Sequence, residues 1–434
     1  LRNSGPNDTI RIGAGTFPEW VVISNSVTLL GSDIYHSSNA PLQKHQSLTI
    51  LTPPTNIYSE SPFVDVYTGN VSLLNLTING DSDGNGTSDA KAGIESPYRP
   101  LTVSNCVMAN LNGYGIRIGY PLVSPSPATS DTDTVRSYFG YNMITNITRQ
   151  TSIAAGIFMQ YSPATCEFNE LAGINGTNAY AGMYIRQCFY TGAMTNPLIV
   201  RNSYFDNCKQ GIWANDFGAA GEAILLFNNV IVDTQIGIRI TAAAGQATIT
   251  NNTVQVEGTT QSSTPTPARG VWIQADANPW APETVTDHLV SGNTITASGD
   301  TTGTVGLLLT YNTTSGSGIN NGVRATVLGN SISGFDFGVG LESGTSGIGI
   351  TNDPLVSATL YLNDVFDSSS MAFYTTGMTN TVNATSNWWG SYTNPSNALS
   401  TNVLYAGWPL GRYYADTDHD GTNDYADADD DGDG

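Results

Sequence analysis

Nine aspartates lie within the last nineteen residues of the chain, in the segment DTDHDGTNDYADADDDGDG (416–434). The first of them follow the pattern D-x-D-x-D-G-x-x-D-x-x-D, in which alternate carboxylates can point at one cation and a glycine permits the sharp turn. Hard oxygen ligands in this number favour Ca²⁺ over zinc. The pattern predicts calcium ligands at Asp416, Asp418, Asp420, Thr422 through its carbonyl, Asp424 and Asp427, with Asp429 and Asp431 opening a second loop.

This segment resembles thrombospondin type 3 repeats and related calcium repeats, which implies a calcium-stiffened connector over residues 411–434. The alternative is a solvated acidic tail, because closely spaced carboxylates repel one another. The second loop reaches Gly434 before its ninth and twelfth positions, so we expect the natural chain to continue beyond this residue.

Other groups that could do chemistry are scattered along the chain. The sequence contains no G-x-S-x-G nucleophile elbow and no phosphate-binding loop. We expect acids such as Asp206 and Asp216, and the dyad Asp287–His288 in a loop, to be solvated surface groups. We therefore assign no catalytic residue. The cysteines form no C-x-x-C pair, which leaves buried thiols or one disulfide among Cys106, Cys166, Cys188 and Cys208.

The elements that would position functional groups form a repeat. A glycine followed by apolar–x–apolar recurs from GIRI (115–118) to GVGL (338–341), at steps of about 26 to 41 residues. An asparagine that opens a short alternating strand recurs between these copies, as in NTVQV (252–256). Stacked copies bury apolar faces that one copy cannot bury. The repeat predicts an all-β solenoid over residues 1–410, with three short strands per coil and asparagine amides bonded from coil to coil.

This repeat resembles the right-handed parallel β-helix, or pectate-lyase-like, superfamily of the bacterial and archaeal surface type. Residues 8–32 resemble its first coil, and NWWG (387–390) resembles the segment that often closes such solenoids. We expect Trp388 and Trp389 to plug the end of the stack. The superfamily includes polysaccharide lyases, pectin esterases and polygalacturonases, but the sequence shows no acidic cluster aligned with an arginine, no paired aspartates in the body and no G-H-G.

The middle residue of each G–apolar–x–apolar copy should point outward, because strand side chains alternate between faces. In six consecutive copies this residue is an aromatic or an arginine. We therefore expect an outward stripe that binds a glycan or a protein partner, unless inserted loops cover it. Its members are Arg117, Phe158, Tyr184, Trp213, Arg239 and Trp272.

Composition limits the partners of the chain. A net charge of −21 disfavours nucleic acid and anionic membranes, and no apolar run approaches the roughly 18 residues of a membrane span. The polar, lysine-poor composition and the glycosylation sequons indicate an extracellular or cell-surface protein. The candidate glycosylation sites are Asn7, Asn70, Asn75, Asn85, Asn146, Asn175, Asn251, Asn312 and Asn383.

Three functions remain open from the sequence. We favour a structural or adhesive surface protein, a rigid β-helix rod on a calcium-stiffened stalk that assembles with itself into filaments or with other surface proteins. A polysaccharide lyase or hydrolase that uses an acid such as Asp206 or Asp216 is one alternative. A non-catalytic glycan-binding module that uses the stripe is the other. The only cofactor expected is Ca²⁺.

Overall fold

The contacts within the chain divide it into two compact units, Leu1–Asp216 and Phe217–Gly434. The predicted boundary at residue 410 lies outside the residues that the structure describes. A computed structural model describes residues 4–32, 34–36, 45–54, 59–86, 88–96, 100–119, 136–149, 153–160, 164–176, 180–186, 197–215, 223–241, 245–258, 267–276, 285–312, 322–343, 356–378, 380–390, 395–407 and 412.

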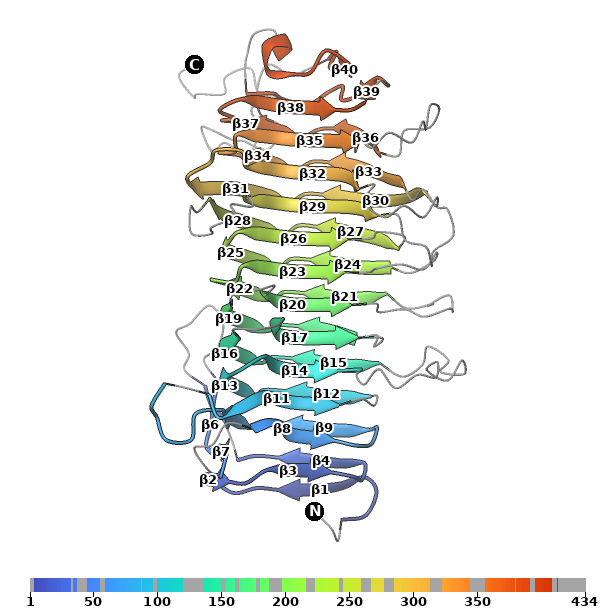
Figure 1. Cartoon of the computed structure of the whole chain (residues 1–434). Helices are drawn as coiled ribbons and strands as arrows, with labels where there is room; N and C mark the ends of the chain where they lie inside the picture. The colour runs from blue at the N-terminus through green and yellow to red at the C-terminus, as the bar shows by residue number, and fades with distance from the viewer. Residues whose placement is uncertain are drawn as a thin grey trace, which may run out of the picture. The chain divides into compact units, whose positions relative to one another are not determined.

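The first unit contains three parallel sheets, and successive coils contribute neighbouring strands (Figure 1). The first sheet consists of β1 (Asp8–Arg11), β4 (Val27–Leu30), β9 (Val71–Leu74), β12 (Leu101–Ser104), β15 (Ser137–Gly140), β18 (Ala164–Glu167) and β21 (Leu198–Arg201). The second sheet consists of β2 (Gly15–Pro18), β7 (Thr49–Thr52), β10 (Thr77–Asn79), β13 (Val107–Leu111), β16 (Met143–Arg149), β19 (Glu170–Gly176) and β22 (Tyr204–Asp206). The third sheet consists of β3 (Val21–Ile23), β8 (Ser59–Val66), β11 (Ala90–Ser96), β14 (Tyr114–Ile118), β17 (Ala154–Gln160), β20 (Tyr180–Arg186) and β23 (Gln210–Asn215). A separate antiparallel pair is formed by β5 (Ile34–His36) and β6 (His45–Ser47).

The second unit repeats the three-sheet arrangement. Its first sheet consists of β24 (Ala223–Phe227), β27 (Gln246–Thr250), β30 (Val285–Ser291), β33 (Gly322–Leu328), β36 (Val356–Tyr361), β39 (Val382–Asn383) and β40 (Val403–Leu404). Its second sheet consists of β25 (Val230–Thr234), β28 (Thr253–Gly258), β31 (Thr294–Gly299), β34 (Ser331–Ser333) and β37 (Asp364–Phe366). Its third sheet consists of β26 (Ile236–Thr241), β29 (Arg269–Asp276), β32 (Val305–Asn312), β35 (Phe337–Ser343) and β38 (Met371–Thr376). A short 3₁₀ helix, η1, spans Pro395–Ala398.

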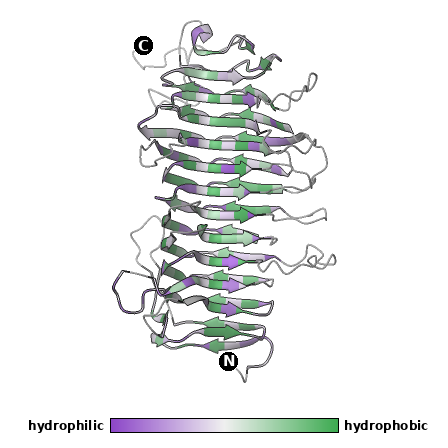
Figure 2. Cartoon of the chain, in the orientation of Figure 1, coloured by the Kyte–Doolittle hydropathy of each residue, from purple (hydrophilic) through white to green (hydrophobic). Residues whose placement is uncertain are grey.

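The chain is thus a right-handed parallel β-helix with three strands per coil, which confirms the predicted fold. Strand residues alternate between a buried core position and an outward one, and Figure 2 shows the hydrophobic residues along the strands. In β14, Ile116 and Ile118 are fully buried while Arg117 between them points outward. In the part of the chain that the structure describes, no helix is long and apolar enough to cross a membrane.

The repeat glycines are required by close packing between the third and second sheets. A Cβ on Gly156 would lie 2.5 Å from the Leu171 side chain, and one on Gly182 would lie 2.5 Å from Phe205. Both distances are shorter than any ordinary carbon contact, so a side chain at these positions would displace the core residue of the next coil. The glycine that opens each copy therefore reflects packing rather than a turn.

Asparagines fill two different roles at the corner between the first and second sheets. Asn252, Asn293 and Asn330 are almost fully buried, and each side-chain amide donates to the Oδ1 of the next asparagine along the stack, at 2.8–2.9 Å. The residue before a ladder position adopts a left-handed backbone, as Asn251 does with φ 55°. The predicted amide ladder is confirmed, but the ladder and the sharp bend belong to adjacent residues rather than to one.

The NWWG segment lies at the last coil of the second unit. Asn387 accepts from Asn363 at 2.8 Å and so ends the ladder. Trp388 and Trp389 are 6% and 3% exposed and contact Phe366 and Phe373 respectively, as a plug of the core requires. The described cysteines are free, buried thiols, namely Cys106, Cys166 and Cys208, whereas Cys188 lies outside the described residues.

Candidate functional site

The outer face of the third sheet carries the predicted stripe. In the first unit the strand register aligns Glu95 with Arg117, Arg117 with Phe158, Phe158 with Tyr184 and Tyr184 with Trp213. The register of the second unit aligns Arg239 with Trp272. The sequence therefore identified the members of each row correctly.

The rings of the first unit pack against one another instead of forming an open platform. Phe158 and Tyr184 are 4% and 1% exposed, with ring centroids 5.3 Å apart, and Tyr184 lies 4.6 Å from the Trp213 ring. Ala155 and Ala181 in the neighbouring outward row belong to the same cluster and leave room for the rings. Phe158 and Tyr184 thus offer no ring face to a ligand, while Trp213 remains partly exposed.

The stripe of the second unit is shorter. The Arg239 guanidinium lies 4.2 Å from the centre of the Trp272 ring, a cation–π distance, and the Trp272 indole N–H donates to Thr310 Oγ1 at 2.9 Å. Both stripe residues are partly exposed. Farther along the row, Leu308 is 2% exposed and Gly340 is covered by the Tyr374 ring. The polar contacts fix the Trp272 ring in place, and its role in binding stays a prediction.

An acidic cluster aligned with an arginine does exist, contrary to the sequence analysis. The register pairs Asp65 with Glu95 and Glu95 with Arg117, so that three successive coils place these side chains in one outward row. The Arg117 guanidinium lies 3.4 Å from Glu95 Oε2, and the Tyr67 hydroxyl donates to Asp65 Oδ2 at 2.6 Å. We call Asp65, Tyr67, Glu95 and Arg117 the acid–arginine cluster. Asp65 was missed because its strand, SESPFVDV, lacks the glycine that marks the other copies.

The acid–arginine cluster combines rigid and open groups. The Arg117 and Glu95 side chains are only 11% and 18% exposed, and the guanidinium also lies 5.1 Å from the centre of the Tyr114 ring. Tyr67 is 54% exposed, and its hydrogen bond to Asp65 raises the pKa of its phenol. Two carboxylates, a guanidinium and a phenol can together accept and donate hydrogen bonds to sugar hydroxyls. Paired carboxylates are also the groups that hydrolyse glycosidic bonds.

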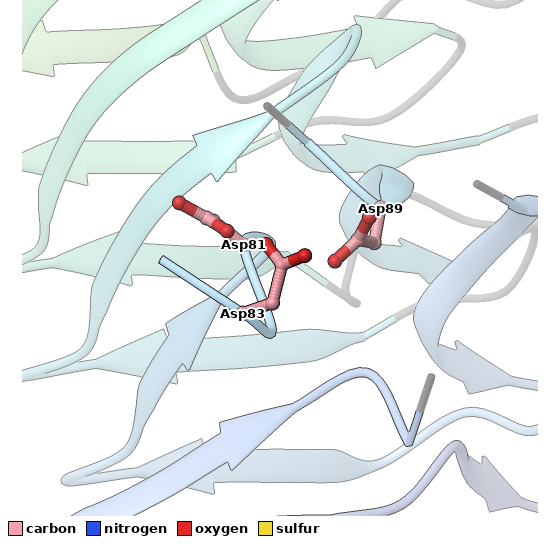
Figure 3. A group of neighbouring side chains, drawn as sticks. All are labelled: Asp81, Asp83 and Asp89. Carbon is pink, nitrogen blue, oxygen red and sulfur yellow. The ribbon is translucent and has the colours of Figure 1, made fainter. Parts of the chain in front are cut away.

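A second group of carboxylates lies in the loop between β10 and β11. Asp81, Asp83 and Asp89 offer ligand atoms that all lie within 4.8 Å of one another (Figure 3). Asp81 and Asp89 are 8% and 3% exposed, whereas Asp83 is exposed. Asp89 Oδ2 accepts from the Ser82 N–H and hydroxyl at 2.9 and 2.5 Å. Burial opposes ionisation of Asp81, but N–H donors led by Gly86 and Gly84 outweigh it and keep the pKa of this carboxyl below its usual range.

These three carboxylates fit a hard divalent cation in their chemistry. The loop reads D-x-D-x-N-G-x-x-D from Asp81 to Asp89, with a glycine at the sixth position. This is the spacing of a calcium-binding loop without its twelfth ligand. The signal is present in the sequence but is weaker than in the tail, where the same spacing carries more aspartates. The residues of the tail site, 416–434, lie outside the described part of the chain.

The sequence also offers Asp206, Asp216 and Asp287 as candidate acids. Asp206 lies in β22 of the second sheet, away from the stripe row, and Asp216 lies outside the described residues. The expectation of a solvated loop dyad is wrong for Asp287–His288. Both residues lie in β30, where Asp287 forms an exposed ion pair with Arg324 while His288 is 2% exposed. Alternation along the strand sends the two side chains to opposite faces.

Most of the candidate glycosylation sites lie at the surface. The Asn75 side chain is half-buried, and those of Asn175 and Asn312 lie outside what the structure describes. The remaining sites are exposed and are Asn7, Asn70, Asn85, Asn146, Asn251 and Asn383.

No protein-family model and no curated protein matches the chain. Among solved structures it is similar to an alginate lyase of the PL6 family, with a TM-score of 0.46 and 14% identity over 94% of this chain and 51% of that one. It is also similar to the A-module of a mannuronan C-5 epimerase from Azotobacter vinelandii, with a TM-score of 0.36 and 14% identity over 81% of this chain and 90% of that one. A third similar structure is an exopolygalacturonase from Thermotoga maritima, with a TM-score of 0.35 and 10% identity over 87% and 83% of the two chains. The chain thus spans about half of the alginate lyase, and these likenesses concern the fold alone.

Proposed function

We propose that this chain is an extracellular polysaccharide-binding protein that recognises its ligand through the acid–arginine cluster. The observation that carries the proposal is the register of β8, β11 and β14, which sets Asp65, Glu95 and Arg117 side by side on one outer face. The ion pair and the neighbouring rings hold Glu95 and Arg117 in fixed rotamers before a ligand arrives. Such preorganisation lowers the entropic cost of binding.

The charge of the chain favours a neutral polysaccharide. The cluster contains two carboxylates and one guanidinium, and the whole chain carries −21. A polyanionic glycan would be repelled at long range, whereas neutral hydroxyl groups can donate to the carboxylates and accept from the guanidinium. The ligand class that follows is an uncharged polysaccharide.

The proposal is tested by electrophoresis of the full chain through native gels that contain a β-glucan, a mannan, a xylan or, as the polyanion, alginate. We expect at least one neutral polysaccharide to retard the protein, and the double variant Asp65→Asn, Glu95→Gln to lose most of that retardation. Asp287→Asn is the matched control, because Asp287 also pairs with an arginine but lies in the second unit. Retardation that survives the double variant would refute the assignment of the site.

Hydrolysis is a second candidate, favoured by the position of Asp65 and Glu95 on neighbouring strands, whose backbones lie about 4.8 Å apart. A general acid and a second carboxylate flanking a glycosidic bond would suffice. New reducing ends released from the same polysaccharides by the wild type, and not by Glu95→Gln, would establish it. Absence of product from every polysaccharide that binds would leave binding without catalysis.

A structural or adhesive role at the cell surface, with a calcium-holding tail at 416–434 and association with copies of the chain or with other surface proteins, is the third candidate. Within each unit the strands form continuous parallel ladders, which suits a rigid scaffold. Sedimentation at rising protein concentration tests self-association, with and without Ca²⁺. A purely monomeric chain in both conditions would exclude the self-assembling form of this role.

A further inference from the structure

At one corner of the first unit, two coils hold an aromatic residue at a left-handed position where the neighbouring coils hold asparagine. Between the first and second sheets, successive coils carry one residue in the left-handed region, and these residues are Asn75 (φ 58°), Asn105 (54°), Tyr141 (59°), Phe168 (55°) and Asn202 (51°). Asparagine tolerates this conformation, whereas a bulky side chain there is an outlier that costs stability. Two adjacent coils therefore hold an aromatic residue where asparagine would be favoured.

Burial does not compensate for this strain. Tyr141 and Phe168 are 40% and 36% exposed. Their rings are nearly parallel, with an interplanar angle of 13° and centroids 4.9 Å apart. Parallel rings in contact at about 3.5 Å must be offset to reach this centroid distance, and an offset pair leaves part of each ring face uncovered. Residues held in sparsely populated backbone regions cluster at binding and active sites.

Polar groups with fixed geometry border the ring pair. Glu167 directly precedes Phe168 and accepts from Arg201 Nε at 2.7 Å and from the Tyr138 hydroxyl at 2.9 Å. The Arg201 side chain is 40% exposed, while that of Glu167 is 13% exposed. The carboxylate and the guanidinium neutralise each other, so the surface presents hydrogen-bonding groups without a free charge. We call Tyr138, Tyr141, Glu167, Phe168 and Arg201 the aromatic corner.

We propose that the aromatic corner is a second saccharide-binding site, specific for neutral sugar units. The uncovered ring faces of Tyr141 and Phe168 match the apolar face of a pyranose ring, and the guanidinium of Arg201 can donate to its hydroxyl groups. A folded protein partner fits less well, because a stable interface covers about 800 Å² per partner and the corner offers two half-exposed rings. The ligand class rests on the proposed function, but the residues belong to another sheet and can be tested separately.

The test uses the double variant Tyr141→Asn, Phe168→Asn in the full chain. Asparagine suits the left-handed backbone, so the melting temperature should stay equal or rise while binding is lost. Leu362→Asn is the matched control, because Leu362 is also left-handed, at φ 55°, is 36% exposed and lies in the second unit. Retardation by β-glucan, mannan and xylan gels is measured for all three proteins, together with sedimentation at rising protein concentration.

We expect the corner variant to bind the retarding polysaccharide about tenfold or more weakly than the wild type, and Leu362→Asn to bind as the wild type does. Undiminished binding by the corner variant, with binding lost only in Asp65→Asn, Glu95→Gln, would overturn the corner and leave the proposed function intact. Binding that is lost only in the corner variant would support the aromatic corner and refute the acid–arginine cluster as the binding site. No binding by the wild type overturns both, and self-association lost in the corner variant would assign the surface to a second copy instead.

Discussion

Acidification should weaken the second unit through one buried imidazole, that of His288 in β30. The side chain is 2% exposed, and its Nδ1 accepts the Ala247 N–H at 3.2 Å. Its Nε2 has no hydrogen-bond partner among the described residues. Burial lowers the pKa of His288 from 6.5 to about 4, and the nearby Asp287 carboxylate opposes this only weakly. The imidazole is therefore neutral in the folded protein at neutral pH.

The sign of the effect follows from the proton count. Between pH 6.5 and about 4 the unfolded chain binds a proton at this histidine that the folded chain does not bind. The stabilisation from the neutral imidazole is thus complete above pH 6.5 and is lost as the pH falls toward 4. At about 1.4 kcal/mol per pH unit, the difference between 6.5 and about 4 corresponds to about 3.5 kcal/mol of unfolding free energy, of which about 3 kcal/mol is lost by pH 4.

The variant His288→Asn separates this group from the other acids of the chain. Its amide oxygen can accept the Ala247 N–H but cannot titrate, so the variant should be less stable at pH 7 and less sensitive to acid. Unfolding by urea, followed by tryptophan fluorescence at pH 7, 6, 5 and 4, measures both curves. We expect the gap between wild type and variant to shrink by about 3 kcal/mol from pH 7 to pH 4. Curves that remain parallel over this range would refute the reasoning.

Three further perturbations test the packing and the loop carboxylates. Asn293→Ala should lower the unfolding free energy by about 3 kcal/mol, because it removes the acceptor of the buried Asn252 N–H and a donor to the Ile249 carbonyl; urea unfolding measures this against the exposed control Asn380→Ala. Gly340→Ala should lower the melting temperature by several degrees, since its Cβ would lie 2.5 Å from the Tyr374 ring, whereas Gly13→Ala meets nothing within 4 Å; an unchanged Gly340→Ala would contradict the contact. Calcium should raise the melting temperature of the full chain over that in a chelator, and Asp83→Asn should reduce the rise; an undiminished rise would exclude the Asp81–Asp89 loop as a site.

The fold could be predicted from the sequence because its signals are local and repeated. A period of two within strands, glycines at fixed places and recurring asparagines each report a contact with the next coil. Ile116 and Ile118 are buried and Arg117 faces outward, as the alternation in GIRI requires. The amide ladder was predicted for the same reason, since a buried asparagine in a stack has little else to bond with.

The candidate sites could not be predicted in the same way, because they depend on which coil lies beside which. Asp65 and Glu95 are thirty residues apart, and only the strand register makes them neighbours. The alternation also gave the outward direction of Phe158 and Tyr184 correctly but not their burial, which arises from ring packing with Ala155 and Ala181. Strand alternation predicts the direction in which a side chain points. Its solvent exposure depends also on the neighbouring side chains that pack over it.

In a solenoid, each position of the coil has the same structural role in every repeat. A residue that suits this role poorly destabilises the fold, and the larger that destabilisation, the stronger the argument that the residue serves another function. At the left-handed corner of the second unit, Leu362 and Ser386 occupy this position in adjacent coils, at φ 55° and 57°, but neither has a ring that could stack. In the first unit, Tyr141 and Phe168 depart in adjacent coils and their rings stack with each other. The rings can stack only because both positions hold an aromatic residue instead of asparagine. Stacking stabilises the pair by about 1 kcal/mol, whereas the left-handed backbone costs about 1–3 kcal/mol at each of the two residues. We attribute the backbone strain that stacking does not offset to ligand binding. Replacing the two rings should therefore raise the stability of this corner while it lowers binding.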